Sequence, residues 1–343
     1  MIKASIIGAS GYTGIELIRL LLKHPDVEIS SIISSSNRDI PIEKTNPQFK
    51  KILNLTFKEF DADLIKEADV VFCALPHGVS QEYVKLAYDL GKVVIDLSSD
   101  FRYKDLARYS KDYGEHKYTN LISESSYGLC EIYREEIKSS KIIGNPGCYP
   151  TSAILGLAPL LKKKLVQKDS IIIDSKSGVS GAGKKSDFAY SFCEVDENFK
   201  AYGVAKHRHT SEIEEKCSFL YGETLNISFT PHLLPVKRGI LSTIYATLTK
   251  NLDKNDLIEI YKQFYKDEFF IRIYEDGLPE LKYVTGTNFV DIGLEVDRKT
   301  NRVIVISCID NLIKGAAGQA IQNMNIKFSL NEKTGLVMAG EYF

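Results

Sequence analysis

The chain has 343 residues, of which 44% are hydrophobic and 26% charged, a composition typical of a globular protein long enough for two domains. Its net charge of −1 gives no overall attraction to nucleic acid or to an anionic membrane, so we expect neither as a partner. Its six cysteines are scattered, without a Cys-x-x-Cys pair, and we find no secretory signal and no apolar run of membrane-spanning length. We therefore expect a cytoplasmic protein with no disulfide framework and no metal site.

The first residues have the pattern of a dinucleotide-binding unit. Residues 1–7 predict a buried strand, and a turn with three glycines leads from it into a helix over 15–22. Such glycines let a pyrophosphate approach the backbone at the helix N-terminus, although similar turns also have purely structural roles. The spacing is G-x-x-G-x-x-G rather than the commoner G-x-G-x-x-G. The cofactor residues predicted here are Gly8, Ser10, Gly11, Tyr12, Thr13 and Gly14.

The segment after the second predicted strand, 27–33, favours NADP over NAD. An NAD site normally has an acidic residue here that binds the ribose 2′-hydroxyl. This chain instead has three serines, Asn37 and Arg38, with no acid before Asp39. Hydroxyl groups and a guanidinium suit a 2′-phosphate, so we predict NADP as cofactor, with Ser35 and Arg38 as ligands. The alternative for Arg38 is a solvated loop charge.

Strands and helices then alternate, with strands predicted at 70–75 and 92–96 and a helix at 80–90. This alternation predicts a doubly wound parallel sheet of the Rossmann type, in which ligands bind beyond the carboxyl ends of the strands. Two loops leave the sheet at those ends. In the first, we expect His77 and Gly78 to pass close to the cofactor. In the second, Arg102 is able to hold an anionic substrate group, or else has a structural role.

The sequence 144–151, Gly-Asn-Pro-Gly-Cys-Tyr-Pro-Thr, predicts a tight turn between a short strand and an apolar helix. It places Cys148 at or near the helix start. The helix dipole and the free N–H groups there favour a thiolate and can bind a developing anion. Cysteine is more often a small buried hydrophobe, so this position is a candidate nucleophile only in combination with other groups.

Those groups lie in the second half of the chain. A strand at 171–174 opens into a glycine-rich loop in which the N–H groups around Ser180 and Gly181 could bind phosphate. Further on, His207 and His209 precede an amphipathic helix, and a histidine at a helix start stays neutral near pH 7 and can act as a base. Glu212 follows three residues later and could orient a neighbouring group.

The remaining pattern is mostly strands, which predicts an α+β domain with a mainly antiparallel sheet and a face free to pack against a second subunit. We expect a homo-oligomer, either a dimer or a tetramer. A final helix is predicted at 310–323, and its small residues on one side suit close packing against the first domain. The fold class is thus α/β, with a nucleotide domain of 1–147 and 312–343, and a catalytic and oligomerisation domain of 148–311.

Motifs spread over nearly the whole chain resemble the N-acetyl-γ-glutamyl-phosphate reductase family, the arginine-biosynthesis branch of the aspartate-semialdehyde dehydrogenase-like superfamily. The most specific is Gly144–Thr151, and Lys184 departs from the arginine expected after the glycine loop. The corroborating motifs are Gly8–Gly14, Leu75–Gly78, Asp96–Arg102, Ser177–Gly183, His207–His209, Thr230–Pro235, Arg238–Leu241 and Asn311–Gln319.

The resemblance implies a reductase that uses NADPH and a small acyl-phosphate substrate. Cys148 would form a thioester, and His209 would be the acid/base, with His207 as the alternative. The resemblance also implies that Asn311 lies near the nicotinamide. The residues assigned to the substrate are Arg102, Asn145, Glu212 and Arg238.

Two alternatives remain open. The first is a related reductase that acts on aspartyl phosphate or on a carrier-linked aminoadipyl phosphate. The second is a non-enzymatic NADP-binding sensor with the same fold, although such proteins tend to lose the nucleophile that this chain retains.

Overall fold

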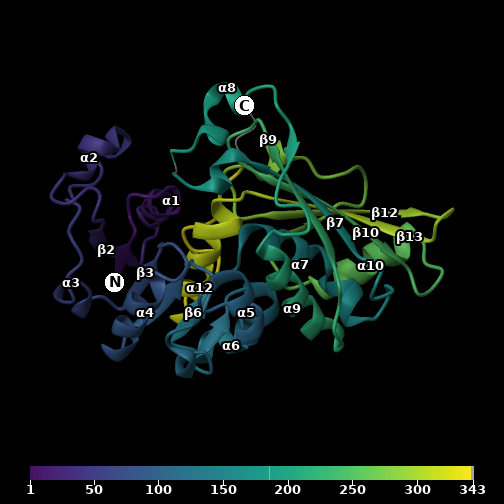
Figure 1. Cartoon of the computed structure of the whole chain (residues 1–343), viewed down its shortest axis with the longest axis horizontal. Coiled ribbons are helices and arrows are strands. Elements are labelled where there is room, and N and C mark those ends of the chain that lie inside the picture. Colours follow the sequence, from purple (N-terminus) through teal and green to yellow (C-terminus); the bar gives the residue numbers. More distant parts are fainter. Residues whose placement is uncertain (185, 341–343) are drawn as a thin grey trace. The chain divides into compact units, whose positions relative to one another are not determined.

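Two units make up the computed structural model, which describes residues 1–184 and 186–340 (Figure 1). The first unit consists of 1–146 and 316–336, and the second of 147–315 with the residues from Val337 onward. The domain boundaries predicted from the sequence placed Gly147, 312–315 and 337–340 in the nucleotide domain, whereas these residues belong to the second unit. Residues 341–343 lie outside the described residues. The described residues include no helix that is long and apolar enough to cross a membrane.

The described part of the first unit contains a six-stranded parallel sheet in the order β2-β1-β3-β4-β6-β5, which confirms the predicted α/β class. The strands are β1 (Ile2–Ile7), β2 (Val27–Ile33), β3 (Val70–Cys73), β4 (Val93–Asp96), β5 (Ser125–Tyr127) and β6 (Ile142–Gly144). The helices are α1 (Tyr12–Leu21), α2 (Ile42–Thr45), α3 (Asp63–Lys66), α4 (Ser80–Asp89), α5 (Leu106–Tyr113), α6 (Cys130–Ser139) and α12 (Gly318–Lys327). Single 3₁₀ turns occur at Pro47–Phe49 and Thr119–Leu121.

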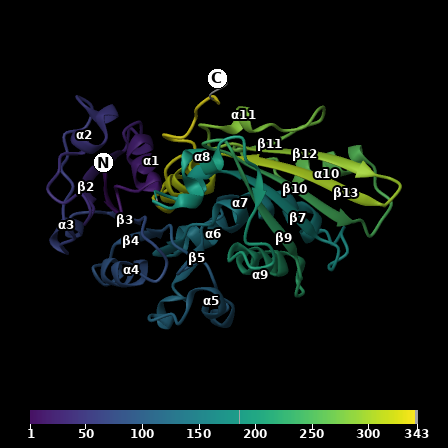
Figure 2. The same cartoon turned by 45° about the horizontal axis from the view of Figure 1, so that its top comes forward.

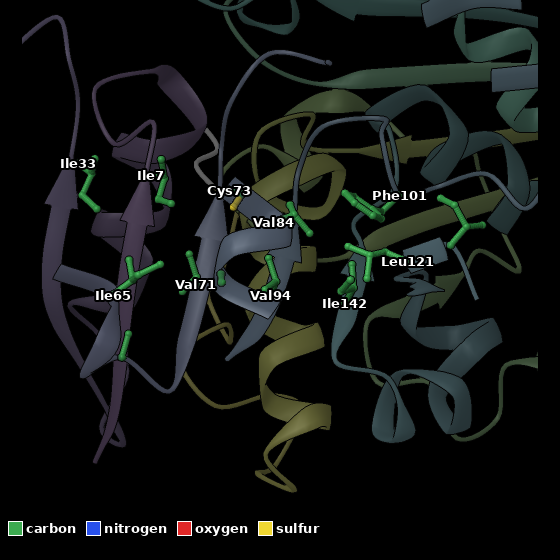
Figure 3. Close-up of a cluster of buried hydrophobic side chains, with 13 residues drawn as sticks. Ile7, Ile33, Ile65, Val71, Cys73, Val84, Val94, Phe101, Leu121 and Ile142 are labelled. Atoms are coloured by element: carbon green, nitrogen blue, oxygen red, sulfur yellow. The ribbon is translucent and has the colours of Figure 1, made fainter. Parts of the chain in front are cut away.

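A hydrophobic cluster runs across one face of this sheet (Figure 3). Its strand residues include Ile7, Val71, Val94 and Ile142, and α4 contributes Val84. Strands such as β3 are apolar at successive positions because parallel strands are buried on both faces. Since all strands of the sheet are parallel, the loops after β1, β3 and β4 leave at one edge, where predicted cofactor residues such as Gly8, Gly11 and His77 lie.

The described part of the second unit contains a seven-stranded mixed sheet in the order β11-β12-β13-β10-β7-β9-β8. As predicted, most neighbouring strands are antiparallel, and the β11–β12 and β7–β9 pairs are parallel. The strands are β7 (Ile172–Gly178), β8 (Lys200–Ala201), β9 (Ser228–Leu234), β10 (Ile240–Thr247), β11 (Ile271–Ile273), β12 (Val290–Asp297) and β13 (Arg302–Ile309). The helices are α7 (Cys148–Lys162), α8 (Phe192–Val195), α9 (His209–Tyr221), α10 (Lys254–Phe264) and α11 (Leu281–Val284). Short 3₁₀ turns occur at Val179–Ala182 and Phe188–Tyr190.

The central helix of this unit, α7, is apolar on nearly all sides and packs on β10 and β13, with α9 and α10 against it (Figure 2). A Cβ at Gly156 would lie 2.8 Å from Ile244 Cδ1, so the small residue lets helix and sheet approach closely. Alternate residues of β10 are buried under α7, which leaves the others on the opposite face of the sheet.

The helix predicted at 310–323 is divided in the structure. A π-helical turn at Ile313–Ala317 precedes α12, and the chain passes from the second unit to the first within this turn. Side chains are absent or small at three of its five positions, Gly315, Ala316 and Ala317.

Candidate active site

The candidate nucleophile, Cys148, is the first residue of α7 and is partly exposed. Gly147 before it is extended, with φ −67° and ψ 153°, and as a glycine it has no side chain with which to cap the helix start. By contrast, burial raises the pKa of the Cys73, Cys217 and Cys308 thiols. Cys148 therefore combines solvent access with a helix start that favours the thiolate.

The two histidines lie at the start of α9. His209 is the first residue of that helix, and its backbone N–H donates to Nδ1 of His207 over 3.2 Å. Tyr149, next to Cys148 in the chain, contacts both imidazoles edge-on, with ring centroids 5.6 Å from His207 and 5.9 Å from His209. The second unit thus brings the two helix starts together around this tyrosine.

The hydroxyl of Tyr149 lies 3.0 Å from the hydroxyl of Tyr202. Burial is the main cause that raises the pKa of both phenols. Both therefore remain neutral near pH 7 and act as hydrogen-bonding groups rather than as bases. The sequence analysis did not single out either tyrosine.

Glu212, one turn into α9, connects the same two helices. Its side chain is fully buried, and Oε1 accepts the backbone N–H of Gly147 over 3.0 Å. The contact joins residues 65 positions apart in the chain. The sequence assigned Glu212 to the substrate, whereas this contact is with the turn before Cys148.

Arg102 and Asn145, also assigned to the substrate, make hydrogen bonds within the first unit. Arg102 Nε donates to the carbonyl of Asn145 over 2.6 Å, and Nη2 donates to the carbonyl of Leu97 over 2.8 Å. The Asn145 amide donates to the carbonyl of Ala316 (3.1 Å) and accepts from Asn323 (3.0 Å). These contacts fix the end of β6 and the turn that follows it.

Arg238 follows β9 and pairs with the fully buried Asp310. The distances are 3.0 Å from Nε to Oδ2 and 3.1 Å from Nη2 to Oδ1, so the carboxylate orients the guanidinium plane. Asp310 also accepts the backbone N–H groups of Gly286 and Ile313.

Asn311, the next residue, joins the glycine-rich loop to the end of β13. Its Oδ1 accepts the N–H of Gly239 over 2.8 Å, and its Nδ2 donates to Ser180 Oγ over 3.0 Å. Gly181 follows Ser180 in the same 3₁₀ turn. Three residues that the sequence assigned to the cofactor therefore lie in one part of the second unit.

The glycine turn of the first unit has the geometry of a dinucleotide site. Gly8 has φ +84°, and a Cβ there would clash with the carbonyl of Ala74, while a Cβ at Gly14 would lie 2.5 Å from the carbonyl oxygen of Gly8. Helix α1 begins at Tyr12, and among the described residues no side chain caps it and no acid occupies its first turn. The N–H groups of its first turn can thus bind the pyrophosphate of a dinucleotide.

Serine hydroxyls gather at the end of β2, as a 2′-phosphate site requires. Ser34 Oγ lies 2.7 Å from Ser10 Oγ and 3.1 Å from Ser36 Oγ. Ser35, which the sequence favoured, is exposed between them.

Arg38 is exposed near these serines and forms ion pairs with Asp39 and Glu59. Exposed ion pairs of this kind contribute little to stability, so they do not prevent the guanidinium from turning toward a phosphate.

The loop at 76–78 is tied to the loop after β4. The N–H of Gly78 donates to both carboxylate oxygens of Asp100, over 3.0 and 2.8 Å, and His77 Nδ1 lies 3.0 Å from Ser99 Oγ. Asp96 and Asp100 are both fully buried. In the segment 96–102 only Arg102 was assigned a role from the sequence, although two aspartates separated by Leu-Ser-Ser were a signal of a polar network. The described residues contain no group of three or more potential metal ligands.

Comparisons with known proteins find two family models and close relatives for this chain. A semialdehyde dehydrogenase NAD-binding domain model matches residues 3–140, and a semialdehyde dehydrogenase dimerisation domain model matches 148–311. Relatives named N-acetyl-γ-glutamyl-phosphate reductase come from Caldicellulosiruptor saccharolyticus (91% identical) and Caldicellulosiruptor bescii (81%), each over 343 residues and the full length of both chains. A third, from Acetivibrio thermocellus, is 52% identical over 345 residues and also covers both chains completely.

Two solved structures have the same fold at low sequence identity. Aspartate semialdehyde dehydrogenase II from Vibrio cholerae superposes with a TM-score of 0.73 at 16% identity, covering 96% of this chain and 98% of that one. Aspartate semialdehyde dehydrogenase with NADP from Candida albicans has a TM-score of 0.71 at 18% identity, covering 95% and 98%.

Proposed function

The chain belongs to the N-acetyl-γ-glutamyl-phosphate reductase family of semialdehyde dehydrogenases, and we propose that it reduces N-acetyl-γ-glutamyl phosphate to N-acetylglutamate semialdehyde with NADPH. It is an NADP-dependent oxidoreductase of arginine biosynthesis. The observation that carries the proposal is the partly exposed Cys148 at the first position of α7, followed by Tyr149, whose ring contacts the imidazoles of His207 and His209.

In the first step, the Cys148 thiolate attacks the carbonyl carbon of the acyl phosphate. The bond between that carbon and the phosphate oxygen breaks, inorganic phosphate leaves, and a thioester forms on the sulfur. The N–H groups in the first turn of α7 stabilise the oxygen that becomes negative during the attack. We assign Arg238, oriented by Asp310, to an anionic group of the substrate.

When bound, NADPH supplies a hydride to the thioester carbon. His209 gives a proton to the resulting thiohemiacetal oxygen and takes it back when the carbon–sulfur bond breaks. The aldehyde leaves and the thiolate is restored. The proton that His209 gives is thus returned, and the proton consumed overall is taken up by the released phosphate. The reaction consumes one acyl phosphate, one NADPH and one proton, and it yields aldehyde, hydrogen phosphate and NADP.

The residues of the first unit fit such a cofactor. The clashes that a Cβ would make at Gly8 and Gly14 leave room only for glycine in this turn, and the start of α1 suits a pyrophosphate. The hydroxyls at the end of β2, together with Arg38, suit the 2′-phosphate. In the second unit we assign Ser180, Gly181 and Asn311 to the nicotinamide end of the cofactor.

The first prediction is tested by measuring NADP reduction with N-acetylglutamate semialdehyde, with and without phosphate or arsenate. We expect turnover that requires the oxyanion, and at least 100-fold lower kcat/KM with aspartate semialdehyde. Cys148→Ser should abolish turnover and keep NADPH affinity within about twofold, because the substitution lies outside the glycine turn. Near-normal turnover by this variant would contradict the cysteine mechanism, and equal use of aspartate semialdehyde would contradict the substrate.

We also propose that the protein is a homo-oligomer that associates through the outer face of the second sheet. A row of side chains crosses three strands on that face, formed by Ile304, Tyr245 and Ile172, which are paired in register. Ile172 is 40% exposed. Helix α7 packs on β10 and β13, α10 packs on β12, and α9 packs on α7. Burial of such a row against a second copy removes apolar surface from water.

A further inference from the structure

The two reactive side chains of the proposed mechanism stand at the starts of different helices. Cys148 begins α7 and His209 begins α9, so the distance between sulfur and imidazole depends on how the two helix starts are held together. Within the second unit, a hydrogen bond joins these starts directly, from the N–H of Gly147 to Oε1 of Glu212.

Several features suit Glu212 to this contact. Gly147 is the residue before the helix, and its N–H has no acceptor within α7, so the Glu212 carboxylate satisfies a donor that the helix itself cannot satisfy. A carboxylate near the positive end of a helix is electrostatically favourable, and its hydrogen bond is stronger than one between neutral groups. Glu212 itself is fully buried, which restricts its conformations.

A buried ion pair lies one turn further along the same helix. Lys216, one turn later, is also buried, and its Nζ lies 2.5 Å from Oε1 of Glu215. Burial lowers the pKa of Lys216, while the charges of Glu215 and Glu212 oppose that shift. This pair holds the part of α9 that follows Glu212 inside the unit.

We propose that Glu212 is a positioning residue, whose hydrogen bond to Gly147 sets the Cys148 thiol relative to the His209 imidazole, and that it does not bind the substrate. The inference rests on the proposed function for the roles of Cys148 and His209. This role for Glu212 replaces its sequence-based assignment as a substrate-binding residue.

The test compares Glu212→Gln with Glu212→Met. Both side chains are uncharged and similar in size, but only glutamine has an oxygen that can accept the Gly147 N–H. We expect kcat of Glu212→Gln within about threefold of the parent, and kcat of Glu212→Met at least 10-fold lower than that of Glu212→Gln. The KM for the acyl phosphate and the Kd for NADPH should change less than threefold in both.

Selective labelling of Cys148 by iodoacetamide gives a second readout that requires no reductase activity. We expect the labelling rate at pH 7 to fall at least fivefold in Glu212→Met relative to Glu212→Gln. Glu215→Met is the matched control, because Glu215 is buried on the same helix but pairs with Lys216. It should leave the labelling rate unchanged.

Three results would overturn the proposal. The first is identical kinetics and labelling in the two Glu212 variants. The second is a 10-fold or greater rise in the KM of either Glu212 variant with its labelling rate unchanged. The third is a loss of kcat in Glu212→Gln equal to that in Cys148→Ser. If Glu212→Met does not fold, the glutamine variant still decides, because the proposal requires that it remain active. If the parent itself lacks the reductase activity, the proposed function fails while the labelling comparison still tests the role of Glu212.

Discussion

At the scale of single residues, the two histidines before α9 have different surroundings. Nδ1 of His207 accepts the backbone N–H of His209, so that nitrogen uses its lone pair to support the helix start. A proton on Nδ1 would remove this hydrogen bond. Because His207 serves as the acceptor at the helix start, His209 is favoured as the group that moves the proton.

The second prediction follows from this difference. His209→Asn should reduce kcat by about 100- to 10,000-fold, the usual contribution of a general acid/base. His207→Asn should cost less than about 10-fold in kcat, because the asparagine oxygen can accept the same backbone N–H. Steady-state rates over pH 6–9 with saturating NADPH measure both effects. The reverse order of losses would make His207 the acid/base.

At the scale of elements, hydrogen bonds join the loops after β3 and β4 through buried carboxylates. Ser80 Oγ donates to one oxygen of Asp96 over 2.5 Å, and Ser98 Oγ donates to the other over 2.6 Å. Burial, followed by the charge of Asp100, raises the pKa of Asp96 to about 6. An aspartate in an unfolded chain has a pKa of about 4.

The third prediction is a pH dependence of stability. Since the folded state binds the Asp96 proton more tightly than the unfolded state, its contribution to the free energy of unfolding is fully present below about pH 4 and is lost as the pH rises through about 6. Asp96→Asn should remove this dependence, which amounts to about 3 kcal/mol over its full range and about half of that between pH 5 and 8. Urea unfolding between pH 5 and 8 measures it. The exposed Glu124→Gln is the control, and parallel pH profiles of parent and Asp96→Asn would contradict the prediction.

The sequence predicted the elements whose signals are local. The glycine turn before α1 and the start of α7 at Cys148 were predicted from neighbouring residues, and the parallel sheet from alternating strands and helices. The helix α9 was predicted to follow the two histidines, whereas it begins at His209 itself. Contacts between distant positions had no such signal. A Cβ at Gly315 would lie 2.8 Å from Cys148 Cβ, which explains a glycine at that position, but only the folded chain brings residues 148 and 315 together. The contacts of Glu212 with Gly147 and of Arg102 with Asn145 are of the same kind.

At the scale of the whole molecule, the order of the chain does not follow the order of the units. Residues 316–336 return to the first unit, where α12 contacts α6, α1 and β4. The residues assigned to the cofactor occur in the first unit and, as Ser180, Gly181 and Asn311, in the second. The effect of a substitution in either unit can be measured separately. NADPH binding reports mainly on the glycine turn, whereas Cys148 labelling reports on α7 and α9.

Oligomer formation is proposed to depend on the outer face of the second unit's sheet and not on the residues around Cys148. The outer face of β10 and β13 carries Tyr245 opposite Ile304, with Ile306 two residues further along its strand. A dimerisation domain model matches this part of the chain, and an apolar row on an exposed sheet face is favourable only when a second surface covers it. A charge introduced into such a covered row would have to be buried without a partner.

The last prediction is that Tyr245→Lys combined with Ile304→Lys dissociates the oligomer. Light scattering after size-exclusion chromatography should give the mass of a single chain, against a multiple of it for the parent. Ile52→Lys is the control, because Ile52 is 64% exposed in the first unit and lies outside this sheet. A double variant with the mass of the parent would place the interface elsewhere. Since Gly147, Glu212 and His209 lie outside the row, the dissociated chain should still label at Cys148, which separates assembly from the chemistry of the site.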